Sequence, residues 1–218
     1  MADASKNNSE INRLVEQAAQ GDDAAWDLLI REHGPRLRRM VALRMDRRLR
    51  GRIDPSDVIQ ESYIDAARRL GEYAKNPTMP FFVWLRFLTG QKLIEQHRRH
   101  LGARARDAGR EISLYHGAFP GATTADLAAH LLGKLSTPSQ AAIRIERTIR
   151  LQEALNSLES IDREILALRH FEQFSNGEAA EILGLDKSAA SKRYARALVR
   201  LKDALVSIPG WHRTNRDG

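Results

Sequence analysis

Residues 175–206 of this chain, SNGEAAEILGLDKSAASKRYARALVRLKDALV, decide its fold class. Ser175 and Glu178 have the spacing of a capping box, in which each side chain bonds the other residue's backbone N–H at the start of a helix. This helix is expected to end at Gly184, because glycine readily adopts the left-handed backbone that terminates helices. A longer helix is expected from about Asp186 to the end of the stretch. A short helix, a turn with glycine and a longer helix predict a helix-turn-helix.

The second helix of this motif carries charge of one sign. Between residues 187 and 202 there are six basic side chains and no acidic one. Small residues at its start would let the helix approach the floor of the DNA major groove closely. The alternative is a solvated amphipathic helix in a basic protein, but the capped helix and glycine turn before it favour DNA binding. The residues expected to contact duplex DNA are Lys187, Ser188, Ser191, Lys192, Arg193, Arg196 and Arg200.

Composition restricts the possible functions further. The 218 residues include 35 Lys and Arg against 28 Asp and Glu, and the resulting net charge of +7 favours a polyanionic partner. The absence of Cys excludes disulfides and thiolate zinc sites and suits a reducing cytosol. No stretch approaches the roughly 18 uncharged apolar residues of a membrane span. We therefore expect a cytoplasmic protein with no membrane insertion, no metal and no cofactor.

Helical spacing of apolar residues extends over most of the chain, as at Trp26, Leu29 and Ile30. Runs of alternating β-branched residues are absent, so the chain is predicted to be all-α. Start and stop signals indicate further helix bounds in the first half of the chain. They are a start at Asp22 or Asp23, a helix from Asp54 and Pro55 to about Leu70 that Gly71 ends, and a helix from about Pro80 to His100.

Residues 112–140 differ in composition from the rest of the chain. Asp126 and Lys134 are their only acidic or basic side chains, and several Gly and Pro interrupt any regular period. We interpret this segment as a flexible linker, and leave open a short helix near residues 125–132. A capping box with its proline at 137–140 opens a second domain. The predicted organisation is two small helical domains, with bounds at 1–110 for the first, 111–137 for the linker, 138–207 for the second and 208–218 for a tail.

An acidic stripe interrupts this basic chain. Residues 31–52 are dense in arginine, and then Asp57, Glu61 and Asp65 follow at a spacing of four, on one helical face with Gln60 beside them. Like charges at this spacing repel each other by about 0.2–0.5 kcal/mol per pair. Two interpretations stay open. Local arginines could neutralise the acidic stripe, or the stripe could dock on a basic surface of another protein. The apolar residues Val58, Ile59 and Ile64 are assigned to the other faces of this helix.

Aromatic side chains are concentrated just after the acidic stripe. Six of the thirteen aromatic residues lie within residues 63–87, and a series of basic residues follows them. This order suits single-stranded nucleic acid, because unstacked bases stack on rings while cations hold the backbone. The rings could equally belong to a core. We assign Phe82 and Phe87 to the core, and for Tyr73 and Phe81 both interpretations stay open.

Taken in order, these features resemble a bacterial RNA polymerase sigma factor of the extracytoplasmic-function group, which keeps sigma regions two and four. The resemblance rests on DVIQE at 57–61, FVWLR at 82–86, IEQHRR at 94–99 and EAAEILGL at 178–185. In that family the acidic helix docks on the clamp helices of the polymerase largest subunit. The helix after it reads and helps open the upstream end of the promoter bubble, and the helix-turn-helix binds duplex DNA upstream.

The resemblance implies a non-catalytic initiation factor whose partners are core RNA polymerase and promoter DNA, and it allows an anti-sigma factor as a third partner. Its implied polymerase-binding residues are Asp57, Gln60, Glu61 and Asp65. Its implied residues for promoter melting and upstream-bubble recognition are Tyr73, Phe81, Trp84, Arg86, Gln91, Lys92, Glu95, Arg98 and Arg99. The chain departs from the family at Gly90, Gln91, Glu95, Ala189 and Ala190, so the promoter sequence is not predicted.

Two other functions fit parts of the sequence. A helix-turn-helix regulator with an N-terminal sensing domain accounts for residues 138–206, but it gives no reason for an acidic stripe followed by aromatic and basic residues. A nucleic-acid enzyme would need metal ligands, and the arginines at 98 and 99 would repel a cation from the neighbouring histidines. The possible ligands for such a metal are Asp57, Glu61, Glu95, His97 and His100.

Overall fold

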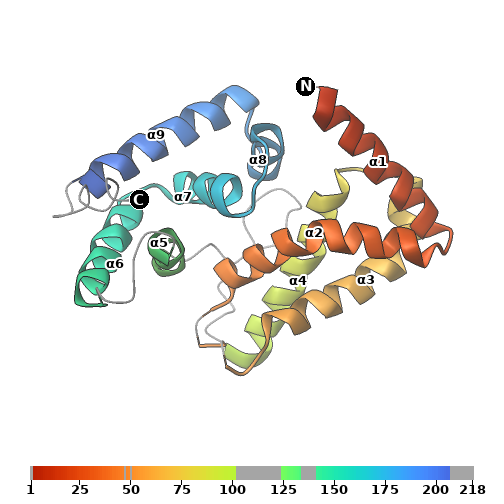
Figure 1. Ribbon diagram of the computed structural model, residues 1–218, viewed down its shortest axis with the longest axis horizontal. Helices are drawn as coiled ribbons and strands as arrows, with labels where there is room; N and C mark the ends of the chain where they lie inside the picture. The colour runs from red at the N-terminus through yellow and green to blue at the C-terminus, as the bar shows by residue number, and fades with distance from the viewer. Residues whose placement is uncertain (1, 47, 50, 102–123, 134–140, 207–218) are drawn as a thin grey trace. The chain divides into compact units, whose positions relative to one another are not determined.

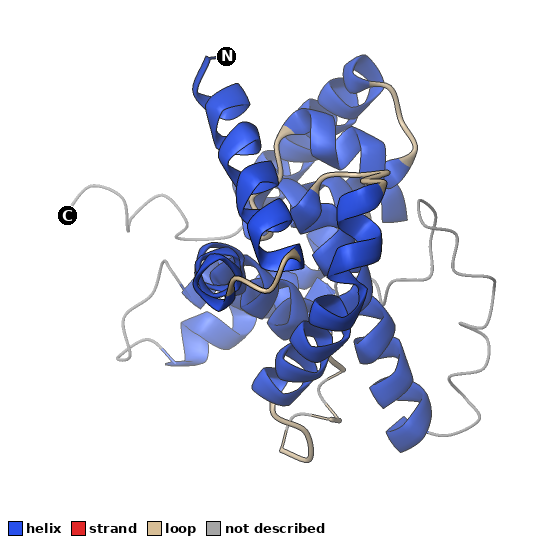
Figure 2. Ribbon diagram, turned by 90° about the vertical axis from the view of Figure 1, so that its right-hand side faces the viewer, coloured by secondary structure: helices blue, strands red, loops and turns tan. Residues whose placement is uncertain are grey.

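A computed structural model describes residues 2–46, 48–49, 51–101, 124–133 and 141–206 of the chain. Within these ranges the regular elements are helices, with no strand, as Figure 2 shows. The all-α prediction is therefore confirmed. The chain divides into two compact units, Met1–Pro120 and Gly121–Gly218. None of the helices in the described ranges is long and apolar enough to cross a lipid bilayer.

The first unit contains four helices within its described residues, which pack on one another (Figure 1). They are α1 (Ala2–Ala19), α2 (Asp23–Arg44), α3 (Pro55–Lys75) and α4 (Phe81–Leu101). The side chains of Leu29, Leu37, Leu85 and Leu93 are fully buried in the core between them. Helix α1 was not among the helices expected from the sequence. Its Leu14 and Val15 are buried, so its packing on α2, α3 and α4 stabilises a segment with a polar start.

The predicted starts of α2 and α3 are confirmed by their caps. Asp22 Oδ1 accepts hydrogen bonds from the backbone N–H groups of Ala24 and Ala25 at 2.9 and 3.1 Å. Asp54 Oδ1 accepts from the N–H of Ser56 at 2.8 Å, and a proline occupies the first turn of α3. Each bond satisfies a donor that has no partner within its own helix.

The predicted end of α3 at Gly71 is wrong, because the helix continues for another turn to Lys75. Gly71 lies inside the helix and does not have the positive φ of a helix-ending glycine. Tyr73 lies just beyond it and is buried, with its ring stacked on Trp84 of α4 at a centroid distance of 4.5 Å. Burial of this ring stabilises the extra turn by more than the roughly 1 kcal/mol that glycine costs a helix.

The second unit contains the remaining described helices. They are α5 (Thr124–Gly133), α6 (Ala141–Asn156), α7 (Ser160–Leu166), the π-helical turn η3 (Ala167–Phe171), α8 (Asn176–Leu183) and α9 (Lys187–Val206). Helix α5 packs on α6, and α9 packs on α6, α7 and α8. The short helix left open within the predicted linker is therefore present. The capping box at 137–140, most of the rest of the linker, and the tail lie outside the described residues.

The helix-turn-helix is built as the sequence predicts. The Ser175 hydroxyl accepts a hydrogen bond from the N–H of Glu178 at 3.2 Å, and the Glu178 carboxylate accepts one from the N–H of Ser175 at 2.8 Å. Gly184 ends α8 with φ +62° and ψ +34°, in the left-handed region. Asp186 Oδ1 then accepts from the N–H of Ala189 at 2.8 Å at the start of α9. Ile165 of α7, Ala180 of α8 and Ala190 of α9 form one buried cluster, in which the two small alanines let the helices pack closely.

Candidate binding surfaces on α3, α4 and α9

The acidic stripe on α3 is divided between solvent and α4. Asp65 forms an ion pair with Lys92 of α4 at 2.8 Å, and Glu61 accepts long hydrogen bonds of 3.3 and 3.4 Å from Gln96. The hydrogen bond from Lys92 lowers the pKa of Asp65 and raises that of Lys92, so both are ionised at neutral pH. Asp57, at the start of α3, is exposed. Asp65 and Lys92, predicted for two different surfaces, therefore pair with each other, and the charges of Arg69 and Arg68 also lower the pKa of Asp65.

The solvent-facing side of α3 includes Ile64, an apolar residue that was predicted to lie on another face of this helix. Ile64 is 53% exposed, and it lies four residues after Gln60 and seven after Asp57, on the same side of the helix. The assignment of Ile64 to another face is wrong, because Val58 and Ile59 form the buried side without it. Its spacing from Asp57 and Gln60 was the signal that could have placed it. We define the outer face of α3 as Asp57, Gln60, Ile64, Ala67, Arg68 and Gly71, all of which are exposed.

The aromatic cluster at the start of α4 belongs to the core of the first unit. Tyr73 is 7% exposed and Phe81 2% exposed. The Tyr73 hydroxyl donates a hydrogen bond to the backbone carbonyl of Met79 at 2.7 Å, and burial raises the pKa of Tyr73 to about 12. These contacts hold the loop between α3 and α4. Of the two interpretations left open for Tyr73 and Phe81, the structure favours the core, since a base would reach either ring only if the cluster opened. Trp84 is half-buried at its edge.

His33 of α2 lies beneath the same cluster. Its ring centroid is 5.5 Å from that of Phe81 and 5.3 Å from that of Phe82. Neither ring nitrogen has a hydrogen-bond partner within the described residues. Burial, reinforced by the charge of Arg36, lowers the pKa of His33 to about 4. The imidazole is therefore neutral at physiological pH, and its protonation would oppose folding.

The polar side chains of α4 differ in their accessibility. Arg86 is 4% exposed, so its assignment to DNA contact is corrected on the same ground of burial. Gln91 is half-buried. Glu95 accepts a hydrogen bond from Arg99 at 2.9 Å and lies 3.6 Å from the Lys92 ammonium. The exposed charges near the end of α4 are Glu95, Arg98 and Arg99.

The candidate metal ligands do not converge. His97 Nε2 accepts a hydrogen bond from the backbone N–H of Asp46 at 3.2 Å, so it is committed to the end of α2. Burial lowers the pKa of His97 and keeps the ring neutral. Glu61 is bonded to Gln96. Across the described ranges no three His, Asp or Glu side chains are grouped closely enough to hold a metal ion.

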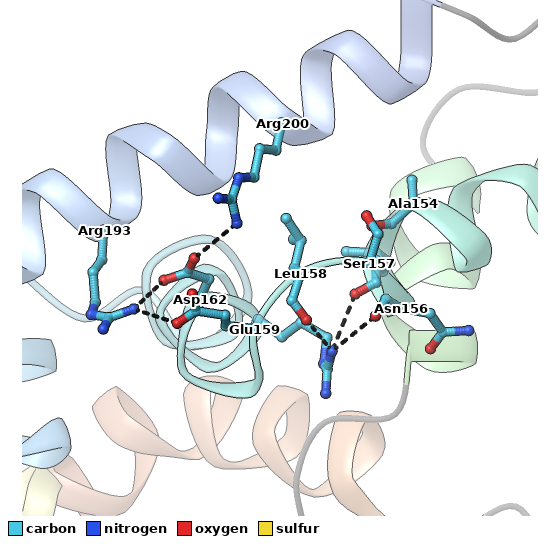
Figure 3. Close-up of polar contacts among 10 residues, drawn as sticks. Ala154, Asn156, Ser157, Leu158, Glu159, Asp162, Arg193 and Arg200 are labelled. Atoms are coloured by element: carbon cyan, nitrogen blue, oxygen red, sulfur yellow. Dashed lines mark hydrogen bonds and ion pairs between the residues drawn. The ribbon is translucent and has the colours of Figure 1, made fainter.

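The basic residues of α9 fall into two groups, one exposed to solvent and one in contact with other parts of the protein. Some of the predicted DNA contacts are exposed, namely Lys187, Ser188, Ser191, Lys192 and Arg196. Arg193 instead donates hydrogen bonds to Asp162 at 2.9 Å and to Glu159 at 3.0 Å (Figure 3). Arg200 lies 3.8 Å from the second oxygen of Asp162. Arg193 therefore contacts Glu159 and the first turn of α7, while Arg200 is exposed and makes only a distant ion pair, so the assignment of both residues to DNA contact stays a prediction.

A second set of contacts holds α9 from the side of η3 and α8. The Tyr194 hydroxyl lies 2.9 Å from His170 Nε2, and the Arg169 guanidinium sits 4.9 Å from the centroid of the Tyr194 ring. The Asn176 amide donates a hydrogen bond to the backbone carbonyl of Lys187 at 2.9 Å. The orientation of α9 is thus set by polar contacts at its start and along its inner side.

These features define a class of protein, an all-helical chain with an exposed acidic and apolar helix face and a basic helix-turn-helix. Sequence comparison identifies the family. The ECF sigma factor family matches residues 8–207. SigD, an ECF RNA polymerase sigma factor of Mycobacterium tuberculosis, is 27% identical over 197 residues, which cover 90% of this chain and 84% of SigD. The RNA polymerase sigma-H factor of Pseudomonas aeruginosa is 25% identical, over 90% of this chain and 94% of its own length.

A comparison of structures agrees on the fold. The solved structure of CnrH in complex with the cytosolic domain of CnrY has a TM-score of 0.53 and 22% identity, covering 90% of this chain and 97% of that one. This likeness supports the helical fold. The chain belongs to the ECF sigma factor family, and it is a promoter-directing sigma factor of RNA polymerase. The identification made from the sequence is confirmed, and the alternative of a helix-turn-helix regulator is not favoured.

Proposed function

We propose that this sigma factor binds core RNA polymerase through the outer face of α3 and promoter DNA through α4 and α9. The observation that carries the proposal is the outer face itself, where Ile64 stands exposed between polar residues while the neighbouring Asp65 is already paired. An apolar centre with a charged rim is the composition of a protein-binding surface. Asp57 supplies a rim charge that suits the basic clamp helices of the polymerase largest subunit.

The proposed contacts with the melted promoter lie at the two ends of α4. Arg98 and Arg99 are exposed near its end and can hold the backbone of a single strand, and the half-buried Trp84 in its first turn is the remaining candidate for stacking on a base. Buried Tyr73 and Phe81 support Trp84 by fixing the loop before α4. Stabilising unpaired bases here would help the polymerase open the promoter.

The proposed contacts with upstream duplex DNA lie on α9. Ser188, Ser191, Lys192 and Arg196 are exposed along its first half, which is the part of a recognition helix that reads base edges and phosphates. We assign sigma region two to residues 1–110 and sigma region four to residues 138–207, joined by the segment 111–137. The polymerase performs the chemistry, so no catalytic residue is proposed for this chain.

A protein that controls this sigma factor is the further partner that we propose. CnrH, which shares its fold, is held in a complex with the cytosolic domain of CnrY. An anti-sigma factor that covers the outer face of α3 or the exposed side of α9 would block the surfaces proposed above. Because bacterial RNA polymerase and its promoters are cytoplasmic, the proposed function places the chain in the cytoplasm.

Charge reversal on the outer face of α3 tests this proposal. Asp57→Lys is expected to weaken binding to purified core RNA polymerase about fivefold to thirtyfold, the effect of about 1–2 kcal/mol at an exposed charge contact. Run-off transcription from a responsive promoter should fall in parallel. Asp27→Lys is the matched control, because Asp27 is an exposed aspartate of the same unit that lies on α2 and not on the outer face of α3. Equal binding by wild type and Asp57→Lys, or equal loss in both variants, would contradict the docking assignment.

A further inference from the structure

We infer that Arg193 is a positioning residue, held by Asp162 and Glu159 so that it sets the orientation of α9 and does not neutralise a DNA phosphate. The inference rests on the proposed role of α9 in binding duplex DNA. It changes the expectation from the sequence, in which Arg193, Arg196 and Arg200 were all predicted to contact duplex DNA. By this inference Arg196 contacts DNA, whereas Arg193 contacts the protein itself.

The contact is built around a buried carboxylate. Asp162, in the first turn of α7, is 2% exposed. One of its oxygens accepts a hydrogen bond from Arg193 at 2.9 Å, and the other lies 3.8 Å from Arg200 (Figure 3). The same nitrogen of Arg193 also reaches the exposed carboxylate of Glu159 at 3.0 Å. Arg193 therefore bridges two carboxylates, while Arg200 makes only a distant ion pair.

Burial makes the contact between Arg193 and Asp162 difficult to exchange for a phosphate. A buried carboxylate that loses its hydrogen-bonded cation is left uncompensated, which is strongly unfavourable in a protein interior. An exposed cation such as Arg196 leaves no such group behind when it turns to DNA. Both acids also raise the pKa of Arg193 above its ordinary value, which is consistent with its charge being stabilised within the protein.

The position of Arg193 on α9 explains how its contact with Asp162 would affect DNA recognition. Successive residues of an α-helix differ by about 100° around the axis, so an error of one residue would replace the entire DNA-facing side. Arg193 faces α7, and this leaves Ser188, Lys192 and Arg196 exposed. Tyr194, the next residue, is held by His170 of η3. Two adjacent side chains thus fix the rotation of α9 on different neighbouring elements.

Salt dependence of DNA binding separates a phosphate contact from a positioning residue. Each phosphate that a protein neutralises adds about 0.9 to the slope of log affinity against log salt concentration. The probe is a short fluorescent DNA duplex of mixed sequence, titrated with the full chain at several KCl concentrations. We expect Arg196→Gln to lower the slope by about 0.9. Arg193→Gln should leave the slope unchanged and lower the temperature of unfolding.

Release of Arg193 provides a test that a simple stabilising role would not pass. In the double variant Glu159→Gln/Asp162→Asn both carboxylate charges that hold Arg193 are lost, so Arg193 becomes available to phosphate and the slope should steepen by about 0.9. Adding Arg193→Gln in that background should return the slope to the wild-type value. Arg196→Gln should lower the slope equally in both backgrounds. Circular dichroism of each variant at the binding temperature checks that it is folded.

The outcomes are distinct. If Arg193→Gln and Arg196→Gln flatten the slope equally in the otherwise wild-type chain, Arg193 binds phosphate and the inference is overturned. That comparison decides between the two roles even if the double variant Glu159→Gln/Asp162→Asn fails to fold. If the wild-type chain shows no salt-dependent binding to duplex DNA, the proposed role of α9 fails, and the inference falls with it.

Discussion

Replacement of Ile64 by alanine is expected to weaken the binding of core RNA polymerase about fourfold to tenfold while leaving the fold intact. Ile64 is 53% exposed on the outer face of α3. Full burial of an isoleucine side chain contributes about 1.5–3 kcal/mol, so covering the exposed half contributes about 0.8–1.5 kcal/mol. A difference of 1.4 kcal/mol corresponds to roughly a factor of ten in affinity.

The fold should tolerate this change because the lost methyl groups face solvent. Substitutions at exposed positions usually alter the free energy of unfolding by about 0.5 kcal/mol or less. Leu28→Ala is the matched control, since Leu28 is 48% exposed on α2 of the same unit but lies outside the outer face of α3. Its effect on the unfolding free energy should be similar, and its effect on polymerase binding negligible.

The measurement is fluorescence anisotropy of the labelled chain titrated with purified core polymerase, with urea unfolding of each variant alongside. Unchanged affinity of Ile64→Ala would refute the argument that this face is covered by the polymerase. So would an equal loss in Leu28→Ala, because the effect would then be general to exposed apolar residues of the unit.

Two further predictions concern the aromatic cluster of the first unit. The lowered pKa of His33 means that the unfolded chain takes up a proton below about pH 6.5, whereas the folded chain does so only near pH 4. The free energy of unfolding therefore decreases as the pH falls through this interval, by about 3 kcal/mol at its lower end. Urea unfolding of wild type and His33→Leu at several pH values should show a loss about 3 kcal/mol larger in the wild type, since His97 titrates in both chains, and parallel curves would contradict it. Tyr73→Phe removes the hydrogen bond to the Met79 carbonyl and should lower the free energy of unfolding by about 1–2 kcal/mol. Promoter opening by folded Tyr73→Phe, followed with a fluorescent base in the melted region, should match wild type, and a selective opening defect would return Tyr73 to the DNA-contacting set.

Signals close together in the chain predicted most of the helix boundaries correctly. The caps at Asp22, Asp54 and Ser175 join a side chain to a backbone group at most three residues away. Gly184 ends α8 through its own backbone conformation. Such interactions are present wherever these residues occur in this order, so no knowledge of packing was needed. The prediction at Gly71 was wrong because it used only such local signals, whereas the helix continues through the contact of Tyr73 with a ring of α4 that is distant in the sequence.

The candidate sites were predicted less well, because exposure depends on what packs against each residue. The acidic stripe was correctly placed on one helix, but whether its charges faced solvent depended on Lys92 and Gln96 of α4. Aromatic residues near a loop suited both base stacking and a core, and the fold placed Tyr73 and Phe81 in the core. Ile64 was assigned to another face, although its spacing from Asp57 matched the exposed side.

The sequence by itself determined the all-helical class, the helix-turn-helix with its cap and turn, the family, and the single charge sign of α9 from Lys187 to Lys202. These follow from residue types, their spacing and short-range hydrogen bonds. Only the tertiary structure decided which of the cations of α9 are available to a ligand. Asp162 lies 31 residues before Arg193, and packing of α7 on α9 brings the two side chains to 2.9 Å. An ion pair across that separation has no local signal, because it exists only when the two helices are already in place.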